Sequence, residues 1–75
     1  MRSDDELTTI SSREVGARMR RIREERGLSP ADLAEKVAVT ADQIRAWESG
    51  QGVAPYDTIK AIAAALGTTS DAFVS

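Results

Sequence analysis

The sequence contains no cysteine and no histidine, and aromatic residues make up only 4% of it. The missing cysteines exclude a disulfide framework and a thiol nucleophile, and without histidine the usual zinc ligand sets are excluded as well. The chain also lacks the commonest general base near neutral pH. No apolar run approaches the ~20 residues of a membrane span, and the amino terminus has the pattern of neither a signal peptide nor a transit peptide. We therefore expect a cytoplasmic protein with no membrane partner, no metal, no cofactor and no catalytic activity.

The length and the charge distribution indicate one small domain preceded by an acidic segment. The chain has 75 residues, of which 41% are hydrophobic and 29% charged, and these are ordinary values for a globular chain. The net charge of −2 gives no overall nucleic-acid signature. Eight of the ten cations lie between residues 13 and 49, where seven acids nearly balance them. We expect residues 1–11 to form a flexible acidic arm and residues 12–75 to form the folded domain.

Capping signals recur along the chain and predict helices. Residues 11–14 fit a capping box, and Gly27 is a good left-handed terminator, so a first helix is expected over about residues 12–26. Ser29 caps the next helix, and Pro30 stands at its first position, where a missing N–H costs nothing. This second helix is expected to have about nine residues, which is short for a globular protein.

A third capping box, at Thr40 and Gln43, begins a helix that Gly50 ends. The second and third helices are joined by only a few residues, and such a short joint forces the sharp crossing angle of a helix-turn-helix. Apolar residues then repeat at helical spacing from Ile59 to Leu66, and a final helical turn follows. No strand-like alternation appears, so the expected fold is all-α with five helices. The predicted core consists of Val15, Met19, Ile22, Leu33, Val37, Ile44, Trp47, Ile59, Ile62, Leu66 and Phe73.

The exposed positions of the third predicted helix have an unusual common property, because all are short or polar. They are Ala41, Asp42, Gln43, Arg45, Ala46 and Ser49. A helix that enters the DNA major groove, about 12 Å wide, needs an outer face of this kind. The same residues also suit an ordinary helical bundle in which they only face solvent. Spacing alone leaves both interpretations open.

Several short motifs occur together, in the same order, in one known family. They are Gly27-Leu28-Ser29, Asp32–Val37, Val39-Thr40, Trp47–Gly50, Ala65-Leu66-Gly67 and Phe73. Over about residues 13–74 the chain therefore resembles Cro/C1-type (XRE-family) helix-turn-helix domains. The resemblance implies a five-helix, lambda-repressor-like DNA-binding domain with its helix-turn-helix at helices two and three.

The resemblance also implies roles for single residues, with residues 40–49 as the recognition helix in the major groove of double-stranded DNA. It assigns base contacts to Ala41, Asp42, Gln43, Arg45 and Ala46, of which Arg45 could also contact a phosphate. It assigns phosphate contacts to Ser49 and Gln51. We further expect phosphate contacts from Thr40 and, on the first helix, from Arg18, with Arg13 and Arg20 as alternatives. Arg23 and Glu48 match a structural salt bridge between the first and third helices, and breaking such a pair can cost ~3–5 kcal/mol when it is fully buried.

Three residues depart from the family pattern. Pro30 stands where the family often has a glutamine whose side chain reaches a phosphate. Ala38 stands in the turn, where the family usually has glycine for a left-handed backbone, at a strain of ~1 kcal/mol. Asp42 suits the amino-terminal end of a helix dipole, but it repels phosphate and could accept a hydrogen bond only from cytosine.

Two functions are therefore predicted. The first is sequence-specific DNA binding by a prokaryotic or phage-type transcriptional regulator such as a repressor, which would act as a homodimer on an operator with two half-sites. The alternative is a helix-turn-helix module used for protein interaction, either antitoxin-like or as an accessory domain fused to a cupin-type enzyme. The acidic balance, Asp42 and Pro30 favour this alternative, and a fold does not by itself establish a function.

Overall fold

The computed structural model describes residues 11–74, and these residues form five helices. The helices are α2 (Ser12–Glu25), α3 (Pro30–Val37), α4 (Ala41–Glu48), α5 (Tyr56–Ala65) and α6 (Asp71–Val74). No strand occurs in this part of the chain, so the predicted all-α fold with five helices is confirmed. The predicted acidic arm, residues 1–11, lies outside the described residues apart from Ser11.

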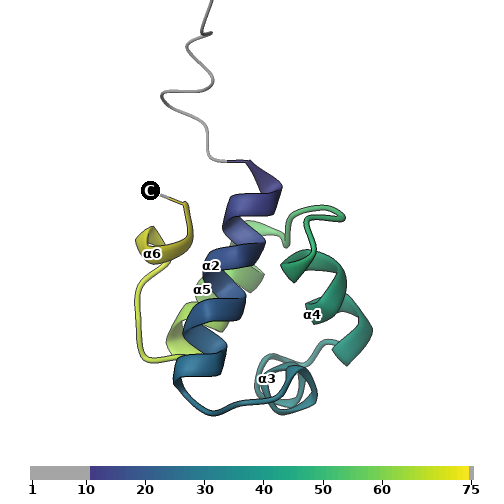
Figure 1. Cartoon of the computed structure of the whole chain (residues 1–75). Coiled ribbons are helices and arrows are strands. Elements are labelled where there is room, and N and C mark those ends of the chain that lie inside the picture. Colours follow the sequence, from purple (N-terminus) through teal and green to yellow (C-terminus); the bar gives the residue numbers. More distant parts are fainter. Residues whose placement is uncertain (1–10, 75) are drawn as a thin grey trace, which may run out of the picture.

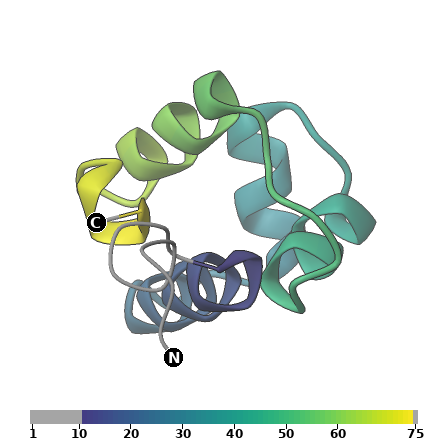
Figure 2. The same ribbon diagram turned by 90° about the horizontal axis from the view of Figure 1, so that it is seen from above.

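The helices surround a shared centre. α2 runs through the middle of the view with α5 behind it, and α4 and α6 lie on its two sides (Figure 1). Seen from above, the five helices form a closed ring (Figure 2). α4 packs against both α2 and α3, while α6 packs against α2 and α5 against α3. α4 is thus held from two sides and keeps its remaining face open. Among the described residues, no helix is both long and apolar enough to cross a membrane.

The start of α3 is fixed by a complete capping box. Ser29 Oγ accepts from the backbone N–H of Asp32 at 3.0 Å, and Asp32 Oδ2 accepts from the backbone N–H of Ser29 at 3.1 Å. The hydrogen bond from the Ser29 backbone, and to a lesser extent the one with the Ser29 side chain, favour the carboxylate and so hold the pKa of Asp32 below its usual value. Both orphan N–H groups are therefore satisfied, and α3 begins where the sequence predicts.

The turn between α3 and α4 depends on one alanine in a left-handed conformation. Ala38 has φ 59° and ψ 41°, a region that alanine adopts only with steric strain. The backbone N–H of the next residue, Val39, donates to the Ala34 carbonyl at 3.1 Å, which closes the end of α3. Because Ala38 turns the chain away from α3, α4 can begin after only three residues, the short connection typical of a helix-turn-helix.

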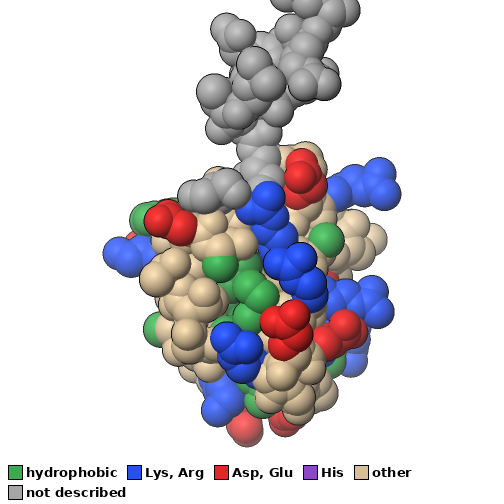
Figure 3. Space-filling view, turned by 60° about the vertical axis from the view of Figure 1, so that its left-hand side comes forward, with side chains coloured by type: hydrophobic (Ala, Val, Ile, Leu, Met, Phe, Trp, Pro, Cys, Tyr) green, Lys and Arg blue, Asp and Glu red, His purple; other side chains and the backbone are tan. Residues whose placement is uncertain are grey.

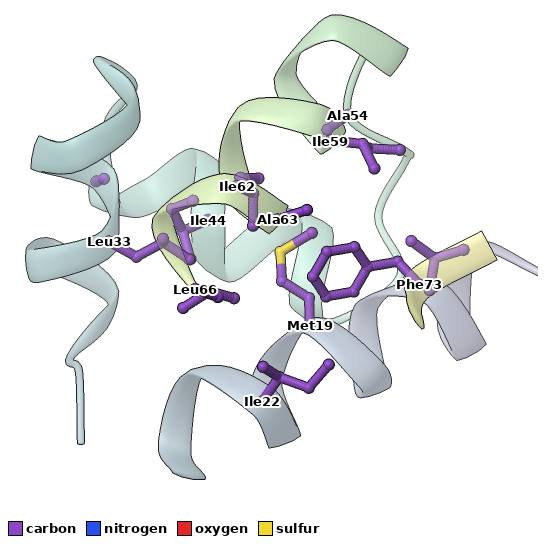
Figure 4. Close-up of a cluster of buried hydrophobic side chains, with 12 residues drawn as sticks. Met19, Ile22, Leu33, Ile44, Ala54, Ile59, Ile62, Ala63, Leu66 and Phe73 are labelled. Carbon is purple, nitrogen blue, oxygen red and sulfur yellow. The ribbon is translucent and has the colours of Figure 1, made fainter. Parts of the chain in front are cut away.

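The core fills the centre of the ring (Figure 4). Val37 and Trp47 are only half-buried, so their predicted place in the core is partly wrong. Val37 is the last residue of α3, and an indole is too large to be covered completely at the edge of a small domain. The buried apolar residues are Val15, Met19, Ile22, Leu33, Ala34, Ile44, Ala54, Ile59, Ile62, Ala63, Leu66 and Phe73.

Arg26 has a different role from the one its spacing predicts. Arg26 follows Ile22 by four residues, the spacing of neighbours on one helical face, but its side chain is exposed. Its Nε donates to the carbonyl oxygen of Leu66 at 2.8 Å. Leu66 ends α5, where helix carbonyls lack partners and attract a cation. Arg26 therefore ties the end of α2 to the end of α5.

We predict that Ala38→Gly stabilises the protein by about 1 kcal/mol, because glycine adopts the left-handed conformation without a Cβ clash. The matched control is Ala61→Gly on the exposed face of α5, which should destabilise by about 1 kcal/mol. Urea unfolding of both variants gives the two free energies. An equal loss of stability in both would show that Ala38 carries no strain.

Candidate nucleic-acid interface

α4, which corresponds to the third predicted helix, is anchored by its inner face. Ile44 is fully buried, while Ala41 and Trp47 pack against the core from its edge. On the outer side, Asp42 and Arg45 are exposed. α4 therefore has one apolar side directed at the core and one short, polar side directed at solvent. This is the division that a helix needs if its outer side is to enter a groove.

A buried ion pair fixes the carboxyl end of α4 to α2. Arg23 Nε lies 2.7 Å from Glu48 Oε2, and Arg23 Nη2 lies 2.9 Å from Glu48 Oε1. The two side chains are only 7% and 6% exposed. The third guanidinium nitrogen, Nη1, donates to the Leu28 carbonyl at 2.7 Å, so the charge is well satisfied. The hydrogen bonds with Glu48 raise the pKa of Arg23. One guanidinium thus joins α2, the following loop and α4.

Close backbone contact between α2 and α4 supports the same junction. A Cβ atom at Gly16 would collide with the carbonyl oxygen of Trp47 and lie 2.8 Å from the backbone of Glu48. Ser12 Oγ, one turn earlier, donates to the Gly50 carbonyl at 3.3 Å. The end of α4 therefore rests directly on the α2 backbone, which only glycine permits.

The polar side chains predicted to contact bases have partners within α4 or at its amino-terminal cap. Gln43 Oε1 accepts from the backbone N–H of Thr40 at 3.0 Å, so the amide is part of the helix cap. Arg45 Nη1 lies 3.1 Å from Asp42 Oδ1, and the Asp42 side chain is 95% exposed. Ala46 is half-buried and offers only a methyl group. The structure brings Asp42, Gln43, Arg45 and Ala46 to one side of α4, whereas Ala41, the fifth predicted base contact, packs against the edge of the core. A ligand on the outer side would have to replace the internal contacts of the three polar side chains.

The residues predicted to contact phosphate on α4 lie at its two ends. Thr40 Oγ1 accepts from the Gln43 backbone at 3.1 Å at the amino end. At the carboxyl end, Ser49 Oγ donates to the Ala46 carbonyl at 3.0 Å, and Gln51 is exposed in the loop that follows. Exposed hydroxyl, amide and backbone groups at both ends of α4 are of the kinds that contact phosphates in protein–DNA complexes.

The structure does not bring Arg18 to this face. Gly16 contacts α4, and Arg18 is two positions further along the helix, which rotates it by roughly 200°. Arg18 is half-buried on the opposite flank of α2. The two alternatives lie on the flank that faces α4, because Arg13 packs beside Gly50 and Arg20 borders the same pocket as Arg45. Helical spacing relative to Arg23 is the sequence signal that distinguishes these arginines.

Among residues 11–74, the cations do not form one continuous basic surface on the face that includes α6. Lys and Arg side chains there alternate with Asp and Glu, and apolar atoms lie between them (Figure 3). Within residues 11–74, no group of three or more acids is placed to hold a metal ion.

Comparison with known proteins places these features in one family. The model of a family described as "Helix-turn-helix domain" matches residues 14–73. No curated protein matches the sequence.

Among solved structures, hydroxypropylphosphonic acid epoxidase from S. wedmorenis is 27% identical with a TM-score of 0.80, and the match covers 87% of this chain and 35% of that one. A crystal structure of FeII HppE gives the same identity and TM-score, covering 88% of this chain and 35% of that one. The chain thus spans about a third of these proteins. The clp gene regulator ClgR from Corynebacterium glutamicum is 22% identical with a TM-score of 0.79, covering 85% of this chain and 68% of that one, and it shows the fold alone.

We predict that Glu48→Gln lowers the free energy of unfolding by about 3 kcal/mol, because it leaves the Arg23 charge buried without a counter-charge. Replacing both Arg23 and Glu48 by methionine removes both charges and should cost clearly less. Urea unfolding of the two variants makes the comparison. The prediction is wrong if the double variant is the less stable one.

We predict that Gly16→Ala destabilises the protein by about 1–3 kcal/mol, because the added methyl forces the α4 backbone away from α2. The sign of the change in unfolding free energy distinguishes the two cases, because in an unobstructed helix the same substitution stabilises the protein by about 1 kcal/mol. Thermal unfolding measures stability, and the amide NMR signals of residues 41–50 report any displacement. A stabilised variant with unshifted signals would contradict the close contact.

Proposed function

The chain belongs to the helix-turn-helix domain family, and from this premise we propose that it binds double-stranded DNA sequence-specifically as a transcriptional regulator of Cro/C1 type. The observation that carries the proposal is the two-sided character of α4, whose inner side is locked to the core and to α2 while its outer side is short and polar. A helix with this support can insert into the major groove as a rigid element. A regulator of this kind would act in the cytoplasm, and we include this location in the proposal.

In the proposed complex, residues 40–49 lie along the major groove. Gln43 is the side chain best suited to adenine, because its amide can both donate and accept. To do so it must release the Thr40 backbone N–H that it now caps. Ala41 and Ala46 offer methyl contacts to thymine, and Asp42 can accept from cytosine. Thr40, Ser49 and Gln51 are the proposed phosphate contacts at the two ends of α4. On α2 this role falls to Arg13 or Arg20, because Arg18 lies on the opposite flank of the helix.

Affinity is expected to depend on symmetry. A net charge of −2 gives little general attraction to DNA, and one short recognition helix makes few contacts. Two copies bound to half-sites about one DNA turn apart would double these contacts. We therefore include a homodimer on a two-half-site operator in the proposal.

A second candidate function is supported by the likeness to the epoxidase, of which this chain spans about a third. In that case the domain formed by residues 12–75 would be an accessory or protein-interaction module, in an enzyme fusion or an antitoxin-like pair. Protein binding together with no DNA binding at low salt would favour this candidate.

We predict that Gln43→Glu weakens binding to a duplex selected from a random library by at least about tenfold, since a lost bidentate base contact is worth ~1–3 kcal/mol. Glutamate retains the capping box, so thermal stability should not change. The control is Ala61→Glu, which adds the same charge on the exposed face of α5.

Fluorescence anisotropy with the selected duplex and a scrambled duplex measures both variants. Failure to select any duplex would overturn the proposed function. Equal weakening by Gln43→Glu and Ala61→Glu would show that Gln43 does not contact a base.

A further inference from the structure

α2, α3 and α4 meet around a pocket of about 280 Å³. Its lining combines three arginines with the first residue of α3 and the carboxyl end of α4. The lining residues are Arg20, Arg23, Pro30, Arg45, Glu48 and Ser49. The pocket thus lies beside the outer face of α4, on the flank of α2 that faces it.

The charges at this pocket are arranged in two layers. Arg23 and Glu48 neutralise each other and are buried, so they form a fixed inner part. Arg20 and Arg45 are largely exposed, with side chains 64% and 60% accessible. Two cations on different helices therefore face one hollow, and neither is needed to balance the buried pair.

Each exposed arginine has a replaceable partner on its own helix. Arg20 Nε lies 3.2 Å from Glu24 Oε2, and Arg45 Nη1 lies 3.1 Å from Asp42 Oδ1. Ion pairs of this kind are weak because water competes for both members. An anion that met both guanidinium groups at once would form stronger, charge-assisted bonds. The two acids then act as counter-ions that such a ligand displaces.

Pro30 contributes no hydrogen-bond donor to this pocket. The amino end of a helix normally offers free backbone N–H groups to an anion, but proline has none at this position. It also has no side-chain donor. The exposed donors that line this pocket are the guanidinium groups of Arg20 and Arg45, because Arg23 is buried against Glu48 and Leu28 and the Ser49 hydroxyl donates to the Ala46 carbonyl.

We propose that this pocket binds one phosphate group, with Arg20 and Arg45 as its ligands in place of Glu24 and Asp42. The inference rests on the proposed function, in which the phosphate belongs to the DNA backbone. It assigns Arg45 to positioning on the backbone, whereas the family resemblance gives it first to a base edge. Phosphate contacts set register and orientation and do not distinguish sequences. Arg20 and Arg45 would thus fix how α4 enters the groove.

The first experiment measures DNA binding of Arg20→Ala and Arg45→Ala over a range of salt concentrations. Each variant should bind selected and scrambled duplexes more weakly by the same factor, and each should reduce the slope of log K against log salt by about 0.9. The control is Arg21→Ala, an exposed arginine of α2 that does not line the pocket. Unchanged slopes, or a loss at Arg45 confined to the selected duplex, would overturn the proposal.

Two variants that each remove one negative charge test whether the ligand displaces Asp42 from Arg45. Asp42→Asn should tighten binding to both duplexes, because Arg45 no longer has an internal competitor. Glu35→Gln, which removes an exposed acid from α3, should tighten binding less, through the change in net charge alone. Equal gains in the two variants would contradict displacement of Asp42.

The second experiment needs no DNA and separates this proposal from the proposed function. Inorganic phosphate is titrated into the protein while the Nε–H NMR signals of the arginines are followed. Saturable shifts of Arg20 and Arg45, both abolished by either alanine variant, support the pocket. If these shifts occur but no duplex binds, the proposed function fails and the ligand is a free phosphate compound. If duplexes bind without these shifts, the pocket proposal fails alone.

Discussion

The bidentate ion pair between Arg23 and Glu48 is the contact on which the placement of α4 depends. The guanidinium reaches the carboxyl end of α4 and the carbonyl of Leu28 at the same time, so one side chain sets the distance between three segments. Its burial makes the geometry strict, because a displaced Glu48 would leave a charge in the protein interior without compensation. The close approach at Gly16 belongs to the same junction, and Ile44 is fully buried on the inner side of α4.

Most polar groups on the outer face of α4 are engaged within the protein. The Gln43 amide caps the helix, Asp42 and Arg45 pair with each other, and Ser49 bonds to a carbonyl. These contacts are exposed, so each contributes little to stability and exchanges easily with water or a ligand. A ligand that bound to this face would replace these internal partners, so the net gain in free energy would be smaller than the number of new bonds suggests.

The helices could be predicted from the sequence because their signals are local. Ser29 with Asp32 and Thr40 with Gln43 form capping boxes within four residues, and the structure contains both. The Arg23–Glu48 contact joins residues 25 positions apart, so spacing could not reveal it, and the sequence indicated it only through the family resemblance.

The remaining differences between sequence and structure arise from tertiary packing. Arg26 continues an apolar stripe in the sequence, yet it bonds to Leu66 because α5 ends beside it. Val37 and Trp47 are half-buried because they lie at the rim of a small core. The pocket beside Arg20 needs three helices to meet, which no local pattern encodes.

α4 is held at both ends. The left-handed turn at Ala38 fixes where the helix begins, and the contact of Gly16 with the backbone of Trp47 and Glu48 fixes where it ends. Residues between these two ends, such as Asp42 and Ala46, can be substituted without disturbing the core. The side chains on the outer face of α4 can therefore be substituted while the position of the helix in the fold stays the same. New binding preferences could be installed there by altering a few side chains, while the fold and the orientation of the helix would stay as they are.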